Sequence, residues 1–367
     1  MRIQSIQIIA ADQSKIECID SILTRPARYF RGSWWVDMEG GGATAGNADW
    51  MSQLPEELWD MSLWDLAIPG SHDSMTYCLD TCSPVLSSES LLKWLDRLVP
   101  CITRPCIYRW ATTQVWCITD QLDAGIRYFD LRIAHKNIKK TCFTQDAFNS
   151  SRSDDTLYFA HAIYTLQTVK EALTSIAVWL EQHQKEIVIL SCSHFYELSD
   201  GEHEALVSFI TLLFGDKLCP RQETPSLSKC WSLGQQVIAS YEDVPILKEH
   251  KELWPKIPYW YANSPDPQRV ISYLEDMQRT QGRPANFFVS GLNLTTYPAL
   301  VVCHPYLTLR KLTMKSFPLL LNWVVDQTPG PDNTSVNIIC ADFVGLTEFA
   351  SVVINLNKKL QKTKDHR

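Results

Sequence analysis

From residue 49 onward, short apolar runs alternate with amphipathic segments along the chain. Continuous apolar runs of this length are typical of strands that are buried on both faces of a parallel sheet. Helical spacing of apolar residues in 166–182 predicts a helix there, and further helices are expected at about 202–214, 268–279 and 346–360. The eight predicted strands lie at 64–70, 126–133, 157–162, 187–193, 236–242, 258–263, 286–292 and 336–343.

This alternation predicts an α/β fold, a distorted (β/α)8 barrel spanning residues 49–362. The order is imperfect, because the stretch 74–125 is long and irregular before the second strand. Residues 1–48 mix Arg, aromatic residues and a Gly-rich linker, and are expected to form a poorly ordered N-terminal extension; contact with an anionic membrane surface is the alternative. Residues 363–367 form a polar tail.

Composition narrows the functional classes. The net charge of -7 argues against broad nucleic-acid binding, which needs a basic surface. No window reaches the roughly 18 apolar residues that span a bilayer, and the N-terminus lacks the apolar length of a signal peptide. The 12 cysteines show no CxxC pair and no Cys/His spacing suited to zinc. These features predict a cytoplasmic protein that contacts membranes only locally.

Polar residues follow the predicted strands. In a barrel the active site lies at the carboxyl ends of the strands, so these residues are expected to converge. They are His72 and Asp73 after the first run, Asp130 and Arg132 in the second, His161 in the third, Ser193, Tyr241 and Asn263 near the ends of the next three, and Asp342 in the last.

This set suits cleavage of a phosphodiester. The reaction needs a base and an acid, and imidazoles such as His72 and His161 serve near neutral pH because their unperturbed pKa is about 6.5. It also needs positive charge at the phosphoryl oxygens, which Arg132 offers as a permanently charged fork. A carboxylate such as Asp342 can hold one imidazole in the required tautomer.

A metal site is the main chemical alternative. The side chains of His72, Asp73, Asp130 and His161 offer ligands for a divalent ion. Arg132 lies two residues after Asp130 and therefore on the same strand face, where its charge would repel a cation. If Arg132 points into the site, metal binding is disfavoured, so we expect no metal and no other cofactor.

At these residues the chain resembles the X-region of phosphatidylinositol-specific phospholipases C, over about residues 48–360. The carrying motifs include LAIPGSHDSMTY (66–77), TDQLDAGIRYFDLRIAH (119–135), LYFAHAIYT (157–165) and KEIVILSCSHF (185–195). The resemblance implies a distorted TIM barrel and a phosphoric diester hydrolase of lipid degradation and signal transduction. It implies an inositol phospholipid substrate, peripheral membrane contact, and diacylglycerol and a cyclic inositol phosphate as products.

The resemblance also implies roles for the site residues. His72 matches the base that deprotonates the inositol 2-hydroxyl, and His161 matches the acid that protonates the leaving diacylglycerol oxygen. Asp73 matches an aspartate that assists the acid, Arg132 the arginine that binds phosphate, Asp342 the partner of the base, and Asp130 a supporting carboxylate.

Departures from the calcium-dependent enzymes of this family indicate the metal-free bacterial pattern. Those enzymes have Asn where this chain has Asp73, an acidic calcium ligand where Arg132 stands, and Glu where Ser193 stands. The positions matching the headgroup-binding residues of the bacterial enzymes are Ser193, Tyr241, Trp260 and Asn263, which lack the charged pair found there. Two alternatives therefore stay open: a lipid-binding protein with little or no turnover, and a phosphodiesterase for another phospholipid headgroup.

Overall fold

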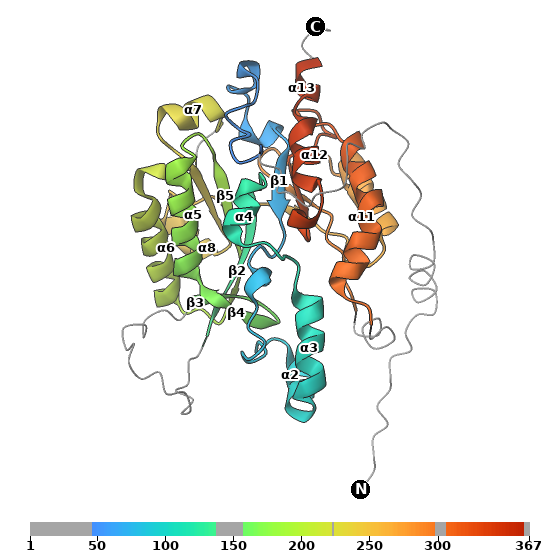
Figure 1. Cartoon of the computed structure of the whole chain (residues 1–367). Coiled ribbons are helices and arrows are strands. Elements are labelled where there is room, and N and C mark those ends of the chain that lie inside the picture. Colours follow the sequence, from blue (N-terminus) through green and yellow to red (C-terminus); the bar gives the residue numbers. More distant parts are fainter. Residues whose placement is uncertain (1–45, 137–156, 222–223, 298–305, 363–367) are drawn as a thin grey trace.

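The computed structural model describes residues 46–136, 157–221, 224–297 and 306–362 (Figure 1). The predicted N-terminal extension and polar tail lie outside these ranges, apart from residues 46–48. Asn47 Nδ2 donates to the carbonyl of Ala124 at 3.1 Å, and the carbonyl of Ala48 accepts from Arg127 Nη2 at 2.5 Å. The last residues of the predicted extension therefore pack against the barrel.

Seven parallel strands form the barrel in the spatial order β6-β5-β2-β1-β9-β8-β7. In the described residues β6 and β7 do not pair as strands, and an isolated parallel bridge joins Ser240 to Trp254 near that seam. The predicted distorted barrel is confirmed. Its strands are β1 (Ile68–Ser71), β2 (Tyr128–His135), β5 (Val188–Tyr196), β6 (Val237–Tyr241), β7 (Tyr259–Trp260), β8 (Val289–Gly291) and β9 (Ile338–Ala341).

The third predicted strand takes a different place. It becomes β3 (Leu157–His161), which runs antiparallel to β2 and pairs with the unpredicted β4 (Ile163–Thr168). Only Ala162, with a φ of +61°, separates the two strands. The expectation of a parallel barrel strand was wrong here, because an apolar run indicates a buried strand without indicating its direction.

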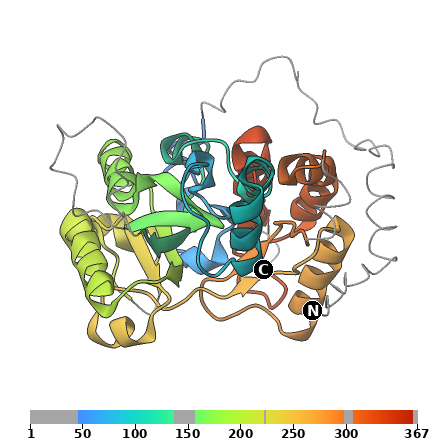
Figure 2. The ribbon, with the colours of Figure 1, turned by 90° about the horizontal axis from the view of Figure 1, so that it is seen from below.

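Helices surround the sheet, with α5 and α6 on one side and α9, α11 and α12 on the opposite side (Figure 2). The four predicted helices are confirmed as α5, α6, α9 and α12. Several others were missed, including two that contain an internal proline, Pro105 in α3 and Pro318 in α11, a residue that argues against a helix in a sequence. The α-helices are α2 (Ser90–Leu98), α3 (Pro100–Ala111), α4 (Ile118–Asp123), α5 (Val169–Gln182), α6 (Asp200–Phe214), α7 (Leu227–Ser232), α8 (Val244–Glu249), α9 (Pro267–Thr280), α11 (Leu309–Asp326), α12 (Phe349–Leu356) and α13 (Lys359–Lys362).

Short 3-10 helices occur in several connections: η1 (Glu56–Leu58), η2 (Leu63–Asp65), η3 (Thr76–Cys78), η4 (Gly215–Lys217) and η5 (Val344–Leu346). At the start of α5, the Thr168 hydroxyl accepts from the Glu171 amide while the Glu171 carboxylate accepts from the Thr168 amide. This reciprocal cap satisfies amide groups that the first helical turn leaves without partners.

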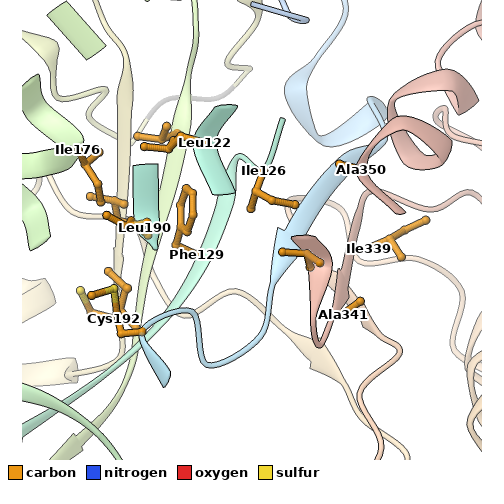
Figure 3. Packing of buried hydrophobic residues seen from close by; sticks show 14 of the residues in the cluster. Leu122, Ile126, Phe129, Ile176, Leu190, Cys192, Ile339, Ala341 and Ala350 are labelled. Atoms are coloured by element: carbon orange, nitrogen blue, oxygen red, sulfur yellow. The ribbon is translucent and has the colours of Figure 1, made fainter. Parts of the chain in front are cut away.

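Strand alternation divides the core into two layers. Outward-facing side chains such as Phe129 and Leu190 pack against Ile176 of α5 and Leu122 of α4 (Figure 3). Inward-facing side chains fill the barrel, and those near the amino ends of the strands are apolar, including Ile68, Tyr128, Ile189, Ile238 and Ile338. Toward the carboxyl ends the inward positions become polar, which places the chemistry at that end.

A buried ion pair lies just before the amino ends of β2 and β5, opposite the polar end of the barrel. Arg127 and Glu186 are both fully buried, and the Nη2–Oε2 distance is 2.7 Å. Glu186 also accepts from the backbone amides of Met51 and Ser52 at 3.3 and 3.2 Å. Because each buried charge depends on the other, this pair ties residues 51–52 to β2 and to the start of β5.

Candidate active site

The six residues predicted as catalytic come together at the carboxyl ends of the strands. His72 and Asp73 follow β1, Asp130 and Arg132 project inward from β2, and Asp342 follows β9. His161 lies at the end of β3, which pairs with β2 in antiparallel orientation. Parallel pairing of β2, β1 and β9 brings five of the side chains to one edge, and the antiparallel hairpin supplies the sixth.

The hydrogen bonds of His72 define its tautomer. Its Nδ1 lies 2.8 Å from Asp342 Oδ1, and its Nε2 lies 2.8 Å from Arg132 Nη2. Arginine only donates, so Nε2 accepts and the proton resides on Nδ1, which donates to Asp342. A neutral imidazole with its Nε2 lone pair toward the site is the form that a general base requires.

Charge around His72 shifts its pKa. Burial of the ring by itself would lower the pKa, but the carboxylates of Asp73 and Asp342 outweigh burial and the nearby Arg132, and hold the pKa above its ordinary value of 6.5. Burial raises the pKa of Asp342 as well, against the opposing effect of His72.

Arg132 links the carboxylates of the site. Its Nε lies 2.5 Å from Asp73 Oδ1, and its Nη2 lies 3.3 Å from Asp130 Oδ2. Burial by itself would raise the pKa of Asp130. The charges of Arg132 and His72 and a hydrogen bond from Ser193 outweigh burial and lower this pKa to about 2. The Ser193 hydroxyl donates to Asp130 Oδ1 at 2.5 Å. Asp130 is therefore a charged anchor that orients the guanidinium.

His161 faces the same carboxylate as His72. The Oδ2 atom of Asp73 lies 3.6 Å from His161 Nε2 and 3.4 Å from His72 Nε2, so one carboxylate oxygen lies between two imidazoles. His161 Nδ1 donates to the carbonyl of Ala111 at 2.7 Å. That bond fixes the ring with Nε2 toward the site, where it can exchange a proton.

A backbone feature supports this arrangement. Asp73 has a φ of +42°, in the left-handed region that few residues other than glycine adopt. Its amide donates to Asp130 Oδ2 at 3.2 Å, which helps to hold the unusual conformation. The turn after β1 thereby directs the His72 and Asp73 side chains into the same site.

Two buried residues that the sequence reading missed hold the backbone of the site. Gln114 Nε2 donates to the carbonyls of His72 and Ala341 at 3.0 Å each, and Gln114 Oε1 accepts from the Val344 amide at 3.2 Å. Thr113 Oγ1 donates to the His72 carbonyl at 3.1 Å. The local sequence gives no signal for these contacts, because they join segments far apart in the chain.

Of the residues predicted to bind substrate, Ser193 lies in the site, and Asn263 is an exposed residue that follows β7. Ser193 bonds to Asp130 and also lies 3.0 Å from Nδ1 of the exposed His194. Asn263 has a φ of +49° and accepts from the hydroxyl of Tyr261 at 3.1 Å.

The structure places Tyr241 and Trp260 away from the site, which corrects their prediction as substrate-binding residues. Tyr241 is fully buried on the outer face of the sheet, where its hydroxyl lies 2.8 Å from His203 Nδ1. Trp260 packs against Phe288 in the same outer layer. Both stand at outward positions of their strands, so neither can reach the polar end of the barrel interior.

Tyr259, one residue before Trp260, takes the inward position instead. Its ring centroid lies 6.2 Å from that of His72, and its hydroxyl donates to Asn293 Oδ1 at 2.9 Å. Alternation along β7 could have identified it, since side chains two apart share a face. The inward register, however, depends on pairing with β8.

The site also contains a set of possible metal donors. Ligand atoms of His72, Asp73 and Asp130 lie within 4.8 Å of one another. Arg132 contacts all three, however, so its guanidinium occupies the position between the donors that a cation would take. The donor set is therefore matched to the guanidinium, and we assign no metal to it.

Sequence relatives agree on one family. The chain is 50% identical over 313 residues to PI-PLC X domain-containing protein 1 of Danio rerio, covering 84% of this chain and 96% of the relative. It is 48% identical over 315 residues to the protein of the same name from Homo sapiens, covering 86% and 93%. A scan against protein-family models found no match.

Solved structures show the same fold. The phosphatidylinositol-specific phospholipase C of Listeria monocytogenes matches with a TM-score of 0.58 at 18% identity, covering 84% of this chain and 98% of that one. A mutant of the enzyme from Staphylococcus aureus matches with a TM-score of 0.57 at 13% identity, covering 85% and 96%. None of the helices in the described parts of the chain combines the length and apolar character needed to cross a bilayer. By sequence, and with the matching barrel, the chain belongs to the PI-PLC X domain-containing protein family.

Proposed function

We propose that the chain is a calcium-independent phosphoric diester hydrolase that cleaves inositol phospholipids to diacylglycerol and a cyclic inositol phosphate. The observation that carries the proposal is the placement of two imidazoles with fixed tautomers on either side of Asp73, beside a guanidinium. This arrangement provides a base, an acid and a phosphate-binding cation within one site, as cleavage of a phosphodiester requires.

In the proposed reaction, His72 Nε2 accepts the proton of the inositol 2-hydroxyl, and the freed oxygen attacks the adjacent phosphorus. The bond from phosphorus to the diacylglycerol oxygen breaks, and His161, in its protonated form, gives that oxygen its Nε2 proton. Asp342 stabilises the imidazolium that forms on His72, and Arg132 binds the phosphoryl oxygens. Water can then open the ring ester with the roles of the two histidines reversed.

The substrate also implies a place of action. We propose a cytoplasmic protein that visits the membrane surface transiently, because an inositol phospholipid lies in a bilayer while the site opens at one end of the barrel. The membrane contact in this proposal is supported by the names of the relatives and of the bacterial structures, which contain phosphatidylinositol, a membrane lipid.

The test is turnover of inositol lipids in the presence of a chelator, scored by phosphorus NMR for the five-membered ring ester. Wild-type protein should form this product. The His72→Ala and His161→Ala variants should lose at least about 10²-fold in rate, as expected for removal of a general base or acid. His250→Ala, which changes a histidine at the end of α8, is the matched control. Full turnover in either site variant contradicts the proposed roles.

One observation favours a second candidate, a phosphodiesterase for a different phospholipid headgroup. Tyr241 and Trp260 do not reach the site, so the expected contacts to an inositol ring are reduced. A panel of phospholipids separates the two candidates, because a headgroup without a hydroxyl beside the phosphate cannot form a cyclic product. A lipid-binding protein without turnover would bind vesicles and form no product from any lipid of the panel.

A further inference from the structure

β5 carries one extra residue where it pairs with β2. Along this pairing, Leu131 lies opposite Cys192. The next residue of β2, Arg132, lies opposite His194 rather than Ser193, which makes Ser193 the inserted residue of a β-bulge. Bulges are rare between parallel strands, and next to active sites they change the direction in which a side chain points. The side chain whose direction changes here is that of His194.

The bulge turns His194 toward the active site. Residues in register on neighbouring strands project to the same face of a sheet, and Arg132 projects inward. Phe195, the next residue, packs on the outer face, where its ring centroid lies 4.6 Å from that of Tyr241. Without the inserted residue, His194 would pair with Ile133, which belongs to the outer core. One extra residue therefore moves His194 from the outer core to the site.

The hydrogen bonds of Ser193 determine the tautomer of His194. A hydroxyl carries one proton, and the Ser193 hydroxyl gives its proton to Asp130 Oδ1 at 2.5 Å, because an ionised carboxylate only accepts. The Ser193 oxygen therefore accepts from His194 Nδ1, which lies 3.0 Å away, so the ring proton resides on Nδ1. Nε2 then carries a lone pair, and within the described ranges it has no hydrogen-bond partner from the protein.

The surroundings of His194 keep its ring neutral. Partial burial of the ring lowers the pKa below its ordinary value of 6.5, and the charge of Arg132 lowers it further. The carboxylates of Asp130, Glu242 and Asp73 act in the opposite direction and are outweighed. At pH 7 the imidazole is therefore mostly uncharged, and its Nε2 accepts a hydrogen bond instead of attracting an anion.

The neighbouring strand adds a carboxylate to this side of the site. Glu242 follows β6, and its amide donates to the Cys192 carbonyl at 3.1 Å, which continues the pairing with β5. Tyr241 faces outward, so alternation turns Glu242 inward. Its Oε1 accepts from Lys256 Nζ, whereas its Oε2 is buried and has no partner among the described residues. Acceptors on both strands suit ligand groups that donate hydrogen bonds, such as hydroxyls, better than they suit phosphates.

We propose that His194 is a specificity-determining residue whose Nε2 accepts a hydrogen bond from a ring hydroxyl of the lipid headgroup. The identity of that headgroup, an inositol, rests on the proposed function. Ser193, which the sequence indicates as a substrate-binding residue, instead orients the imidazole. Arg132, in register beside His194, binds the phosphoryl group attached to the same ring. A headgroup without a hydroxyl at this place leaves Nε2 without its donor and binds more weakly.

Two substitutions separate binding by Nε2 from the contact of Nδ1 with Ser193. The side-chain amide of asparagine lies near the position of a histidine Nδ1, and that of glutamine lies near the position of Nε2. His194→Asn therefore keeps a donor for Ser193 and loses the acceptor for the headgroup, whereas His194→Gln keeps the acceptor and loses the donor. His250→Asn, which changes a histidine at the end of α8, is the matched control.

Binding is measured without turnover, by NMR titration of the full chain. The probes are inositol 1-phosphate and methyl phosphate, which keeps the phosphate and lacks the ring. His194→Asn should bind inositol 1-phosphate about three- to tenfold more weakly than the wild type, as expected for the loss of one hydrogen bond. His194→Gln and His250→Asn should bind it within about twofold of the wild type, and methyl phosphate should bind all four proteins alike. Equal affinity of the wild type and His194→Asn for inositol 1-phosphate overturns the proposal, as does a wild type that does not bind it.

Turnover of a water-soluble inositol phosphodiester gives a second readout. His194→Asn should raise KM about three- to tenfold and leave kcat within about twofold, because the hydrogen bond is present in the ground state and the transition state alike. If His194 acts only through Ser193 on Asp130, His194→Gln will lower kcat and His194→Asn will not, which overturns the proposal. If no inositol substrate is turned over but inositol 1-phosphate still distinguishes the wild type from His194→Asn, the role of His194 in binding stands and the proposed function fails.

Discussion

The Asp342→Asn substitution tests the assignment of His72 as the base. The Oδ1 atom of Asp342 lies 2.8 Å from His72 Nδ1, and the carboxylate is 1% exposed. Its Oδ2 atom has no hydrogen-bond partner among the described residues, so an asparagine can turn its carbonyl oxygen toward Nδ1. The opposite orientation would force a proton onto Nε2, against the Arg132 donor 2.8 Å away. The tautomer of His72 should therefore survive, and only the charge is lost.

The size of the effect follows from that charge. In the transition state His72 becomes an imidazolium beside Asp342, and two unit charges about 4 Å apart attract by about 4 kcal/mol at an effective dielectric constant of 20. The neutral hydrogen bond that asparagine keeps offsets roughly 0.5–1.5 kcal/mol of this. The net loss of about 2–4 kcal/mol predicts a fall in kcat of roughly 30- to 1000-fold.

The pH profile gives a second readout. Because the Asp342 carboxylate helps to raise the pKa of His72, its removal should move the rising limb on the acidic side of the kcat/KM profile to lower pH. The assay is turnover of a water-soluble inositol phosphodiester with chelator present. Asp65→Asn, which alters a carboxylate bound to Arg283 at 2.7 Å away from the site, is the matched control. A loss below about fivefold, or a limb displaced to higher pH, refutes the reasoning.

Four further outcomes are expected. In the wild type, the rising limb of kcat/KM on the acidic side of the pH profile should have a midpoint above pH 6.5, because His72 must be neutral and its pKa is raised; a midpoint below pH 6.5 in a stopped assay contradicts this. Because the pKa of His72 is higher in the folded protein than in the unfolded chain, protonation of His72 increases the free energy of unfolding. This contribution should be fully present below pH 6.5 and lost as the pH rises through the pKa of the folded state. Urea unfolding at several pH values measures it. Glu186→Gln should lower the free energy of unfolding by about 3–5 kcal/mol, because it leaves Arg127 buried without its charge partner, and a loss below 1 kcal/mol in urea unfolding excludes that reading. Gly291→Ala should lower the free energy of unfolding by about 1–3 kcal/mol and reduce turnover, because the added Cβ would lie 2.4 Å from Tyr259 Cε1 and displace the Tyr259 ring. Turnover at the wild-type rate would show that catalysis does not depend on the position of Tyr259.

The sequence alone determined the barrel class and the main part of the site. Residues such as His72, Asp130 and Asp342 stand at or just after the carboxyl ends of apolar strands, and parallel strands bring those ends to one edge. Their convergence therefore followed from local pattern once the barrel was inferred. Arg132 was placed beside Asp130 in the same way, because alternate residues of a strand share a face.

Only the tertiary structure decided which face of each strand turns inward. Tyr259 rather than Trp260 reaches the site, and Tyr241 packs on the outer face, because inward register is set by pairing with strands distant in the sequence. The antiparallel direction of β3 and the hold of Ala111–Gln114 on both histidines are likewise long-range. A local pattern records period and burial, whereas direction, register and contacts between distant segments are settled by packing of the whole chain.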